Sequence, residues 1–543
     1  MKPLSSRIQW ANKEWSVEAI CLAVAVFCSL AFNWTFVGKV IETNSLQGTS
    51  GLILGAVLTI VATALHLLLF LLLSYRFTVK PVLSLVLLIS AAAAYYMSRY
   101  TVYLDVDMLR NVLHTDTKES RELMTLPMIG TIALLGGVPA LLLWTLRIQK
   151  STLFVAFRRR LIWIIATLVV LAATAFASYQ PLSSFLRNHR ELRYLVTPSN
   201  FMIGLAKVGA GETKRKPRQA IGLDAKLVPQ KPGQKPALIV LVAGETVRAQ
   251  NWGLNGYARQ TTPRLKAIEP INFSHVSSCG TATEVSLPCM FSPWGRADFD
   301  MDRIKNSQSF LHVLSRVGID VRWIDNQSGC KGVCEGLPTE SIQHVAKATP
   351  YCTVEKGCFD RELTERLKAV PRVNGDQFVV LHTLGNHGPS YYARYPASAR
   401  VFTPECLEDD LGRCTVAQIT NSYDNAIVAT DAVLADTIAY LQTVTDRDTA
   451  LIYVSDHGES LGENGLFLHG LPYSIAPQTQ KTVPMIMWLS DGIKRDRHIN
   501  ATCLSQRATQ PASHDNLFHS VLGLMGVNTA LYRADRDVFA SCR

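Results

Sequence analysis

Charged side chains are scarce in this sequence, and they are scarcest in its first third. Only 18% of the 543 residues are Asp, Glu, Lys or Arg, while 48% are hydrophobic; an average soluble domain is about 25% charged. The apolar excess lies in five runs of about 18–24 residues, a length that crosses a bilayer core about 30 Å thick. One such run is compatible with a core helix of a soluble protein, but five in succession are not. The sequence therefore predicts five membrane spans, near 16–37, 51–74, 80–97, 127–146 and 161–179.

The first apolar run lacks the small-residue cleavage site of a secretory signal peptide, and further runs follow it, so we expect it to remain as a span. Basic residues in the short loops predict the orientation, because such loops stay in the cytoplasm. With five spans, the loop 98–126 and everything after about residue 180 then lie on the far side of the membrane. The basic loop residues are Lys2, Arg7 and Lys13, then Arg76 and Lys80, then Arg147, Lys150, Arg158, Arg159 and Arg160.

Cysteine is absent between Cys28 and Cys279. Cys21 and Cys28 fall within the first run, where they act as small apolar residues. The other ten cysteines all follow residue 278, and an even number confined to an exported domain predicts disulfides formed in an oxidising compartment. Zinc binding by Cys330 and Cys334 is disfavoured, because no matching histidine pattern lies beside them. Local spacing predicts the pairs Cys279–Cys289, Cys330–Cys334, Cys352–Cys358 and Cys406–Cys414, and leaves Cys503–Cys542 by elimination.

A basic connector follows the last apolar run. Apolar residues recur at helical spacing over 181–196 with arginines between them, which predicts an amphipathic helix on the membrane surface or a helix packed on the exported domain. Lys, Pro and Gly are then frequent, as in a flexible linker. The formal net charge of +11 reflects these basic segments and contact with anionic lipid; no aromatic–basic pattern indicates a nucleic-acid partner. The predicted domains are a transmembrane domain 1–180, an interfacial helix and linker 181–235, and an exported catalytic domain 236–543.

Strand and helix patterns alternate in the exported part. Continuous apolar runs at 237–242, 377–384 and 450–455 are typical of strands buried on both faces, and helical patterns lie between them, for example at 310–317 and 423–443. This alternation predicts a doubly wound α/β/α domain of about 300 residues with a largely parallel sheet. In such a domain, ligands bind beyond the carboxyl ends of the strands.

Acids and histidines follow these predicted strands. Glu245 comes after the first, Asp456 and His457 after the third, and His387 after the second, with His469 further on. One acid or histidine at a strand end is commonly a cap or a surface group. Several at one sheet edge form a set of oxygen and imidazole ligands that suits zinc.

Thr283 lies in the segment SSCGTATEVSLPCM (277–290), where a loop leads into a predicted helix at 284–290. A side chain there faces unpaired backbone N–H groups and the positive end of the helix dipole, a favourable place for an oxyanion or phosphate. An ordinary N-cap threonine in a disulfide-closed loop is the alternative. Beside zinc, the hydroxyl would be a nucleophile with a lowered pKa.

Several long segments resemble one known family. They are AGETVRAQNWGLNGY, SCGTATEVSLPCMF, DNQSGCKGVC, HTLGNHGPSYYARYP and SDHGESLGENGLFLHG, and they are similar, in this order, to those of the lipid A phosphoethanolamine transferases of the alkaline phosphatase superfamily. The resemblance implies a zinc site of Glu245, Thr283, Asp456 and His457, with Thr283 as the nucleophile. It implies that His387 and His469 bind a second zinc or the transferred phosphate, and that Lys331 and His382 contact substrate.

In the loop 98–126, Asn111, Thr115 and Glu119 match the family's N-x3-T-x3-E set, which faces the donor head group. Their i, i+4, i+8 spacing would put all three on one face of a helix. The alternative for these residues is a polar helix face at the membrane surface.

The resemblance also implies the reaction. Phosphatidylethanolamine would donate its head group to Thr283, and a lipid A phosphate of lipopolysaccharide would accept it, lowering the surface charge and giving resistance to polymyxin and other cationic peptides. The enzyme would be a multi-pass inner-membrane monomer with one tight zinc site and its catalytic domain in the periplasm. Transfer to another envelope glycan, such as the lipopolysaccharide core sugars, and phosphoglycerol transfer are alternatives. A secreted hydrolase is disfavoured, since the C-x-[PS]-x-R motif of sulfatases is absent around Thr283; a non-catalytic receptor would not need the Glu/Thr/Asp/His set.

Overall fold

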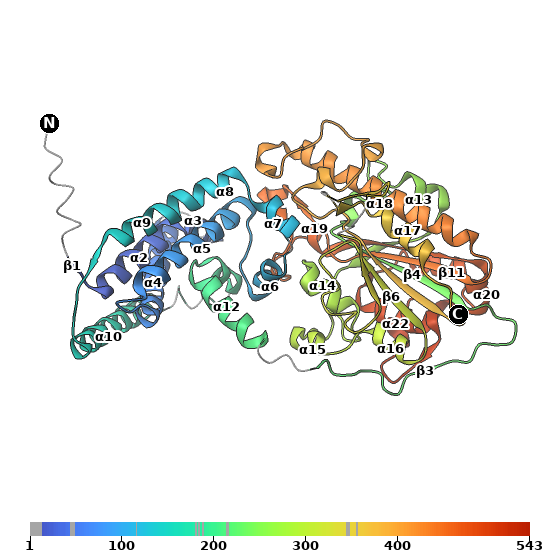
Figure 1. Cartoon of the computed structure of the whole chain (residues 1–543), viewed down its shortest axis with the longest axis horizontal. Coiled ribbons are helices and arrows are strands. Elements are labelled where there is room, and N and C mark those ends of the chain that lie inside the picture. The colour runs from blue at the N-terminus through green and yellow to red at the C-terminus, as the bar shows by residue number, and fades with distance from the viewer. Residues whose placement is uncertain are drawn as a thin grey trace. The chain divides into compact units, whose positions relative to one another are not determined.

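The chain folds into two compact units (Figure 1). The computed structural model describes residues 14–43, 49–115, 117–179, 182, 185–186, 189–212, 217–343, 348–354 and 357–543. The helical unit comprises residues 1–109 and 124–213, and the α/β unit comprises residues 110–123 and 214–543. The segment 110–123 thus interrupts the helical unit in sequence but packs with the α/β unit.

Among the described residues of the helical unit, four helices are long and apolar enough to cross a membrane, and a bent pair, taken as one span, makes five. We count five, as predicted from the sequence. The third and fourth spans pack closely at Gly136, because this residue has no side chain. A Cβ at this position would lie 3.0 Å from the Leu88 Cα. The spans are α2 (Val17–Ala31) with α3 (Trp34–Thr43), α4 (Thr49–Leu73), α5 (Val79–Tyr100), α8 (Leu126–Thr131) with η2 (Ile132–Gly137) and α9 (Val138–Thr145), and α10 (Leu153–Ala177).

The first span bends by 51° between α2 and α3. Asn33 lies at the break and is buried. Its Nδ2 donates to the carbonyls of Cys28 at 2.9 Å and Thr197 at 2.8 Å, and its Oδ1 accepts from the Thr197 N–H at 2.9 Å. A polar side chain that binds helix carbonyls can break a helix and satisfy the freed backbone groups, which explains a bend in an otherwise apolar run.

The fifth span begins earlier than the sequence predicts. Thr152 caps α10, so the helix starts at Leu153 and includes Arg158–Arg160, which the sequence pattern assigns to a loop. Arg159 donates to the Gln149 side chain at 2.8 Å, and Arg160 donates to the Ser74 carbonyl at 2.6 Å. Long basic side chains can reach polar groups near a helix end, so charges there do not stop the helix.

An eight-stranded sheet forms the centre of the α/β unit, in the order β15-β5-β14-β11-β4-β10-β6-β7. The pairs β11–β4, β4–β10, β10–β6, β6–β7 and β15–β5 are parallel, and only β14 runs antiparallel to its neighbours. The doubly wound, largely parallel sheet predicted from the sequence is therefore confirmed. The strands are β4 (Ala237–Gly244), β5 (Ile271–Ser277), β6 (Asp320–Asp325), β7 (Thr339–Ser341), β10 (Gln377–His382), β11 (Asp448–Ser455), β14 (Thr482–Leu489) and β15 (Ala512–Ser513).

Helices cover both faces of this sheet (Figure 1). One layer contains α13 (Pro263–Ile268), α17 (Arg361–Ala369) and α18 (Val416–Thr443), and the other contains α14 (Thr283–Met290), α16 (Phe310–Arg316) and α22 (Asp515–Met525). Every residue of β4, β10 and β11 is buried, as expected for strands between two helix layers. The carboxyl ends of these three strands therefore open onto one edge of the sheet, where the predicted site residues follow.

Five disulfides close loops of the α/β unit. They coincide with the predicted pairs, four from local spacing and the fifth by elimination, and Cys21 and Cys28 are free and buried. Four of the bridges span ten residues or fewer, so they fix local loops rather than join distant elements. The pairs are Cys279–Cys289, Cys330–Cys334, Cys352–Cys358, Cys406–Cys414 and Cys503–Cys542.

The connector is helical at its described positions 182, 185 and 186, as expected for 181–196, but it continues as a 3-10 helix rather than as one amphipathic α-helix. Residues 180–181, 183–184 and 187–188 lie outside the described part. The described part has a 3-10 helix, η3 (Arg190–Leu195), and then α12 (Ser199–Glu212). Pro198 explains the boundary, because the residue before a proline is disfavoured in the helical region and proline itself suits a helix start.

Candidate active site

Thr283 and Glu245 meet at the sheet edge. Glu245 follows β4 directly, and both side chains are buried. The Thr283 hydroxyl lies 3.1 Å and 3.0 Å from the two carboxylate oxygens of Glu245 and 3.3 Å from Nε2 of His457. Gly385, in the turn after β10, allows this packing, since a Cβ there would lie 2.4 Å from the Glu245 carbonyl oxygen.

Thr283 is the first residue of α14, and Ala282 is the N-cap. The sequence prediction began this helix one residue later and left an N-cap role open for Thr283; the structure assigns that role to Ala282, whose side chain cannot cap. The Thr283 hydroxyl is therefore directed to the acid and imidazole rather than to its own helix. The Cys279–Cys289 bridge joins the loop before Thr283 to the helix after it, which restricts the position of the hydroxyl.

Asp456 and His457 follow β11 and complete the cluster. Asp456 Oδ1 accepts from the backbone N–H groups of Thr246 at 3.1 Å and His457 at 2.7 Å. Asp456 Oδ2 lies 3.5 Å from His457 Nε2. His457 Nδ1 lies 3.0 Å from the Gly458 carbonyl, so the Nδ1–H donates there and Nε2 is left for a ligand, as in many metal-binding histidines.

These side chains fit a zinc ion. Ligand atoms of Glu245, Asp456 and His457 all lie within 4.8 Å of one another, and all three residues are buried. The Asp456 Oδ2 atom is buried with no hydrogen-bond partner among the described residues, which is costly for a carboxylate unless a cation binds it. Two carboxylates, one imidazole and a hydroxyl form a set of hard and borderline ligands that zinc accepts with tetrahedral geometry.

The electrostatics of the metal-free cluster indicate the same need for positive charge. Burial and the nearby Glu245 carboxylate raise the pKa of Asp456. Burial alone would raise the pKa of Glu245 and lower that of His457, but their hydrogen bond and opposite charges hold Glu245 well below its ordinary pKa and, with the charge of Asp456, raise the pKa of His457 to about 10. Without a metal, the imidazolium supplies the charge that the two carboxylates require.

His387 and His469 lie beside the cluster. The His469 ring is 4.3 Å from the His457 ring and 5.7 Å from the His387 ring, measured between centroids. His469 Nδ1 lies 3.4 Å from Glu459 Oε2, and the same oxygen accepts from the Tyr391 hydroxyl at 3.0 Å. Glu459 is buried and orients His469, so that Nε2 of this histidine is available to a substrate.

Lys331 and His382 lie on neighbouring elements of the same edge. Lys331 has a positive φ of 48° in the disulfide-closed loop after β6, and its Nζ donates to the Ser328 hydroxyl at 2.7 Å. His382 ends β10, is buried, and its Nδ1 lies 2.7 Å from Asp325 Oδ1. Asp325 also accepts from the Gly329 N–H at 2.9 Å, so it links His382 to the loop that carries Lys331.

The expected helix through the N-x3-T-x3-E set is wrong as a continuous element. α6 (Val106–His114) ends before Thr115, and α7 (Thr117–Leu123) begins after residue 116, which lies outside the described part. The Thr115 hydroxyl donates to the Asn111 carbonyl at 2.8 Å, an interaction with the last turn that favours a helix end. The side chain of Glu119 also lies outside the described residues.

An ion pair joins α7 to the loop that carries His387 within the α/β unit. Arg394 Nη1 donates to Glu122 Oε1 at 3.1 Å, and Nη2 donates to Oε2 of the same carboxylate. Arg394 Nε donates to the His387 carbonyl at 2.6 Å. The Arg394 side chain is 2% exposed, so this contact places the segment 110–123 directly against the backbone of His387.

We expect Glu122→Gln to lower the head-group transfer that the sequence resemblance implies by about tenfold or more. Loss of one partner of a buried, hydrogen-bonded pair costs about 3–5 kcal/mol, because the other charge remains uncompensated, and here that charge holds His387. Transfer by purified full-length protein, measured with a fluorescent lipid donor, checks this expectation. Glu408→Gln is the matched control, because Glu408 pairs with Arg413 on the surface, at 3.3 Å. Equal rates for both variants would contradict the role of Glu122.

Three further residues of the site were not predicted from the sequence. They are Glu459, Gln327 and Arg394, and all lie within or beside the segments that carry the resemblance. Buried residues that only orient other site residues follow no periodic pattern in a sequence, so periodicity could not predict them. Gln327 Nε2 donates to Glu245 Oε2 at 3.0 Å, and so orients this carboxylate. The only available signal was that Glu459 and Gln327 follow the same strand ends as Asp456 and Asp325.

Comparison with known proteins agrees with this geometry. A family model described as Sulfatase matches residues 237–527, which include the whole sheet and its acids and histidines. The α/β unit is thus a sulfatase-like domain of the alkaline phosphatase superfamily. A second family model, described as Phosphoethanolamine transferase EptA/EptB, matches residues 62–213, in the helical unit.

Whole-length relatives identify the family. The chain is 37% identical over 530 residues to the phosphoethanolamine transferase EptA of Escherichia coli strain K12, with 96% of each chain covered. It is 36% identical to the phosphatidylethanolamine transferase Mcr-1 of Escherichia coli, with 98% of each covered. The solved structure of the lipooligosaccharide phosphoethanolamine transferase A from Neisseria meningitidis matches with a TM-score of 0.92 and 36% identity, covering 98% of this chain and 100% of the other. The protein belongs to the phosphoethanolamine transferase family and is a membrane-bound transferase.

Proposed function

We propose that this enzyme transfers phosphoethanolamine from phosphatidylethanolamine to a phosphate of lipid A, with Thr283 as the nucleophile. The observation that carries the proposal is the buried Thr283 hydroxyl within 3.3 Å of both Glu245 and His457. Phosphoryl transfer explains this arrangement best, because it uses a hydroxyl at a helix start beside two carboxylates and an imidazole. The Escherichia coli and Neisseria relatives are named for phosphoethanolamine transfer, which supports the head group.

The proposed cofactor is zinc, held by Glu245, Asp456 and His457 with the Thr283 oxygen. When bound there, zinc would lower the pKa of the Thr283 hydroxyl and stabilise negative charge on the phosphate. One tight site is proposed, and a second ion at His387 and His469 is an option that their adjacent rings allow.

In the first step, Thr283 Oγ forms a bond to the phosphorus of phosphatidylethanolamine, and the bond from phosphorus to the diacylglycerol oxygen breaks. The threonine proton passes to a nearby base, and the leaving oxygen gains a proton from His387 or His469, so diacylglycerol departs. In the second step, a lipid A phosphate oxygen attacks the same phosphorus, the bond from phosphorus to Thr283 Oγ breaks, and this oxygen regains the proton held by the base. Lys331 is placed to balance the charge of the phosphate.

Asn111, Thr115 and Glu119 are proposed to contact the donor head group, and His382 to line the site. The segment 110–123, which carries Asn111, Thr115 and Glu119, belongs to the same compact unit as the proposed catalytic residues. The Glu122–Arg394 ion pair connects this segment to the loop of His387 and supports its participation.

We also propose the domain limits 1–180, 181–235 and 236–543, an inner-membrane location with a periplasmic catalytic domain, and a monomer. Added ethanolamine would reduce the negative charge of lipid A, and so reduce the binding of polymyxin and similar cationic peptides.

We expect cells that express the enzyme to carry phosphoethanolamine on lipid A, and cells without it to lack that addition. Mass spectrometry of isolated lipid A, with the core oligosaccharide analysed separately, checks the acceptor. Expression of Thr283→Ala is the control for induced changes in other enzymes. Phosphoethanolamine found on core sugars alone would favour the alternative acceptor, and phosphoglycerol on either fraction would overturn the donor.

A further inference from the structure

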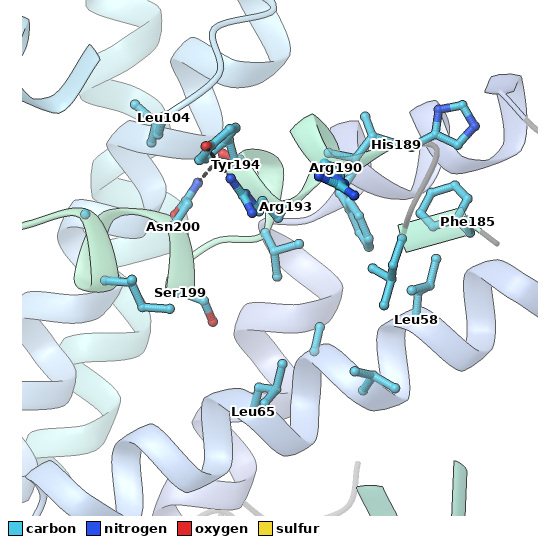
Figure 2. A pocket seen from close by; sticks show the side chains of 18 of the residues that line it. Leu58, Leu65, Leu104, Phe185, His189, Arg190, Arg193, Tyr194, Ser199 and Asn200 are labelled. Carbon is cyan, nitrogen blue, oxygen red and sulfur yellow. Dashed lines mark hydrogen bonds between the residues drawn. The ribbon is translucent and has the colours of Figure 1, made fainter. Parts of the chain in front are cut away.

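The helical unit contains a cavity of about 520 Å³. None of the candidate catalytic residues described above lines this cavity. Its walls come from α3, α4, the segment before α6, the connector with η3, and α12 (Figure 2). This volume lies within the range of ligand pockets in proteins, about 300–1,000 Å³. Every residue that lines it belongs to the helical unit, so the cavity is described without reference to the α/β unit.

One wall of the cavity is hydrocarbon. α4 contributes Leu58, Val61, Ala62 and Leu65, and Figure 2 shows Leu58 and Leu65 directed from this helix toward the connector. Because α4 is long and apolar enough to cross a membrane, we expect an occupant of this wall to come from the bilayer rather than from water. The wall therefore suits an acyl chain. Phe36, Leu104 and Phe185 extend it on the other elements.

The opposite wall carries positive charge. Arg190, Arg193 and Lys207 line the cavity, and no Asp or Glu occurs among its lining residues. None of the three cations has an ion-pair partner among the described residues; Arg193 Nη2 donates instead to the Tyr194 hydroxyl at 2.7 Å. Figure 2 shows Arg190 and Arg193 on the connector, across from Leu58 and Leu65. All three side chains are exposed, and together their charge favours an anion beside the cavity.

Ser199 adds a separate indication of a ligand. This residue begins α12, lines the cavity, and is only 8% exposed. Its hydroxyl is buried with no hydrogen-bond partner in the described part of the chain, although the adjacent Asn200 is fully engaged with the Tyr194 carbonyl at 2.9 Å and the Thr197 hydroxyl at 3.1 Å. A buried hydroxyl without a partner is unfavourable, and a rotation of the Ser199 side chain toward the cavity would let an acceptor oxygen of a ligand satisfy it.

We propose that this cavity binds an acidic glycerophospholipid of the phosphatidylglycerol type. One acyl chain packs on the α4 wall, an ester or phosphate oxygen accepts from Ser199, and the anionic head group lies against Arg190, Arg193 and Lys207. A zwitterionic lipid fits less well, because the cavity offers no carboxylate to an ammonium group. The argument for this site rests on the helical unit alone and does not depend on the proposed reaction.

Lipid titration of the full-length protein tests the proposal. The protein is purified in detergent, stripped of lipid, and titrated with phosphatidylglycerol or phosphatidylethanolamine of identical acyl chains, with bound lipid counted by native mass spectrometry. We expect one saturable phosphatidylglycerol site, at least tenfold tighter than for phosphatidylethanolamine. Each basic residue near an anionic lipid contributes about fivefold, so Arg190→Ala/Arg193→Ala should weaken binding by about 25-fold.

Matched variants keep the result interpretable. Arg190→Lys/Arg193→Lys should retain most binding, because the charge remains, and this pair separates loss of charge from misfolding. Arg76→Ala removes an exposed arginine that does not line the cavity and should have no effect. Val61→Trp should weaken binding of both lipids by filling the cavity, and Ser199→Ala should weaken phosphatidylglycerol binding by several-fold.

Two outcomes would overturn the proposal. Equal affinity for the two lipids would remove the charge selection and make the cavity a general lipid or donor site. Binding that never saturates, or that Arg190→Ala/Arg193→Ala leaves unchanged in a folded protein, would reduce it to adventitious annular lipid. Thr283→Ala should bind phosphatidylglycerol as the wild type does, so a failure of the proposed transfer reaction would be seen separately.

Discussion

Thr283→Ala is expected to lower phosphoethanolamine transfer by about 10⁴-fold or more, the size of effect seen when an enzyme loses its nucleophile. The hydroxyl lies 3.0 Å from Glu245 and 3.3 Å from His457, and alanine leaves no atom that can attack phosphorus. The fold should remain, since Thr283 makes no cap bond for its own helix. Thr283→Ser should keep part of the activity, because the oxygen survives and only the methyl that restricts its rotamer is lost.

Mass spectrometry of the peptide that contains Thr283 measures this directly. Wild-type protein incubated with donor alone should carry one phosphoethanolamine on this residue, and added acceptor should remove it. Thr281→Ala is the matched control: it removes a hydroxyl from the same loop, one that donates to the Leu471 carbonyl at 2.6 Å, and should still form the adduct. A Thr283→Ala protein that transfers at the wild-type rate would rule out the covalent intermediate.

Removal of zinc should lower transfer by at least about 10²-fold, the effect of losing a main source of charge stabilisation in an active site. Two buried carboxylates then depend on the His457 imidazolium alone, and the Thr283 hydroxyl keeps its ordinary acidity. Dialysis against a chelator, followed by metal analysis and a transfer assay, measures the loss. Zinc should restore activity and magnesium should not, because magnesium prefers an octahedral set of oxygen ligands.

Asp456→Asn tests the same site without a chelator. It should reduce bound zinc and transfer together, because Asp456 is one of the three candidate metal ligands and its Oδ2 atom is buried with no hydrogen-bond partner among the described residues. Asp535→Asn, which changes an exposed aspartate paired with Arg533 at 2.9 Å, is the matched control and should retain both. If Asp456→Asn loses activity but keeps a full equivalent of zinc, the metal lies elsewhere.

The sheet and the spans could be predicted because their signals are local. Strands buried on both faces read as continuous apolar runs, as at 237–242 and 450–455, and a span needs only length and low charge. Boundaries were less accurate: α10 begins at Leu153 rather than near 161 because Arg159 and Arg160 find polar partners. Helix boundaries depend on such side-chain contacts between segments distant in sequence, and these have no local pattern.

The candidate metal-binding cluster could be predicted from the sequence only in part. Glu245, Asp456 and His457 follow strands, and a parallel sheet brings the carboxyl ends of its strands to one edge, so the sequence placed them together before any distance was known. The second layer could not be predicted in this way. Glu459 on His469 and Gln327 on Glu245 are single polar contacts between loops, and any of many buried polar residues could have had these roles.

The sequence by itself determined the chemistry of this protein: which residue types follow which strands, which cysteines lie near one another in the chain, and which runs can cross a membrane. Only the tertiary structure decided how distant segments use that chemistry. The helix breaks between Asn111 and Glu119, and Glu122 pairs with Arg394. Ser199, Arg190 and Leu65 line one cavity. The physical reason is that composition and periodicity act over a few residues, whereas a cavity or a buried ion pair exists only where separate elements pack and exclude water.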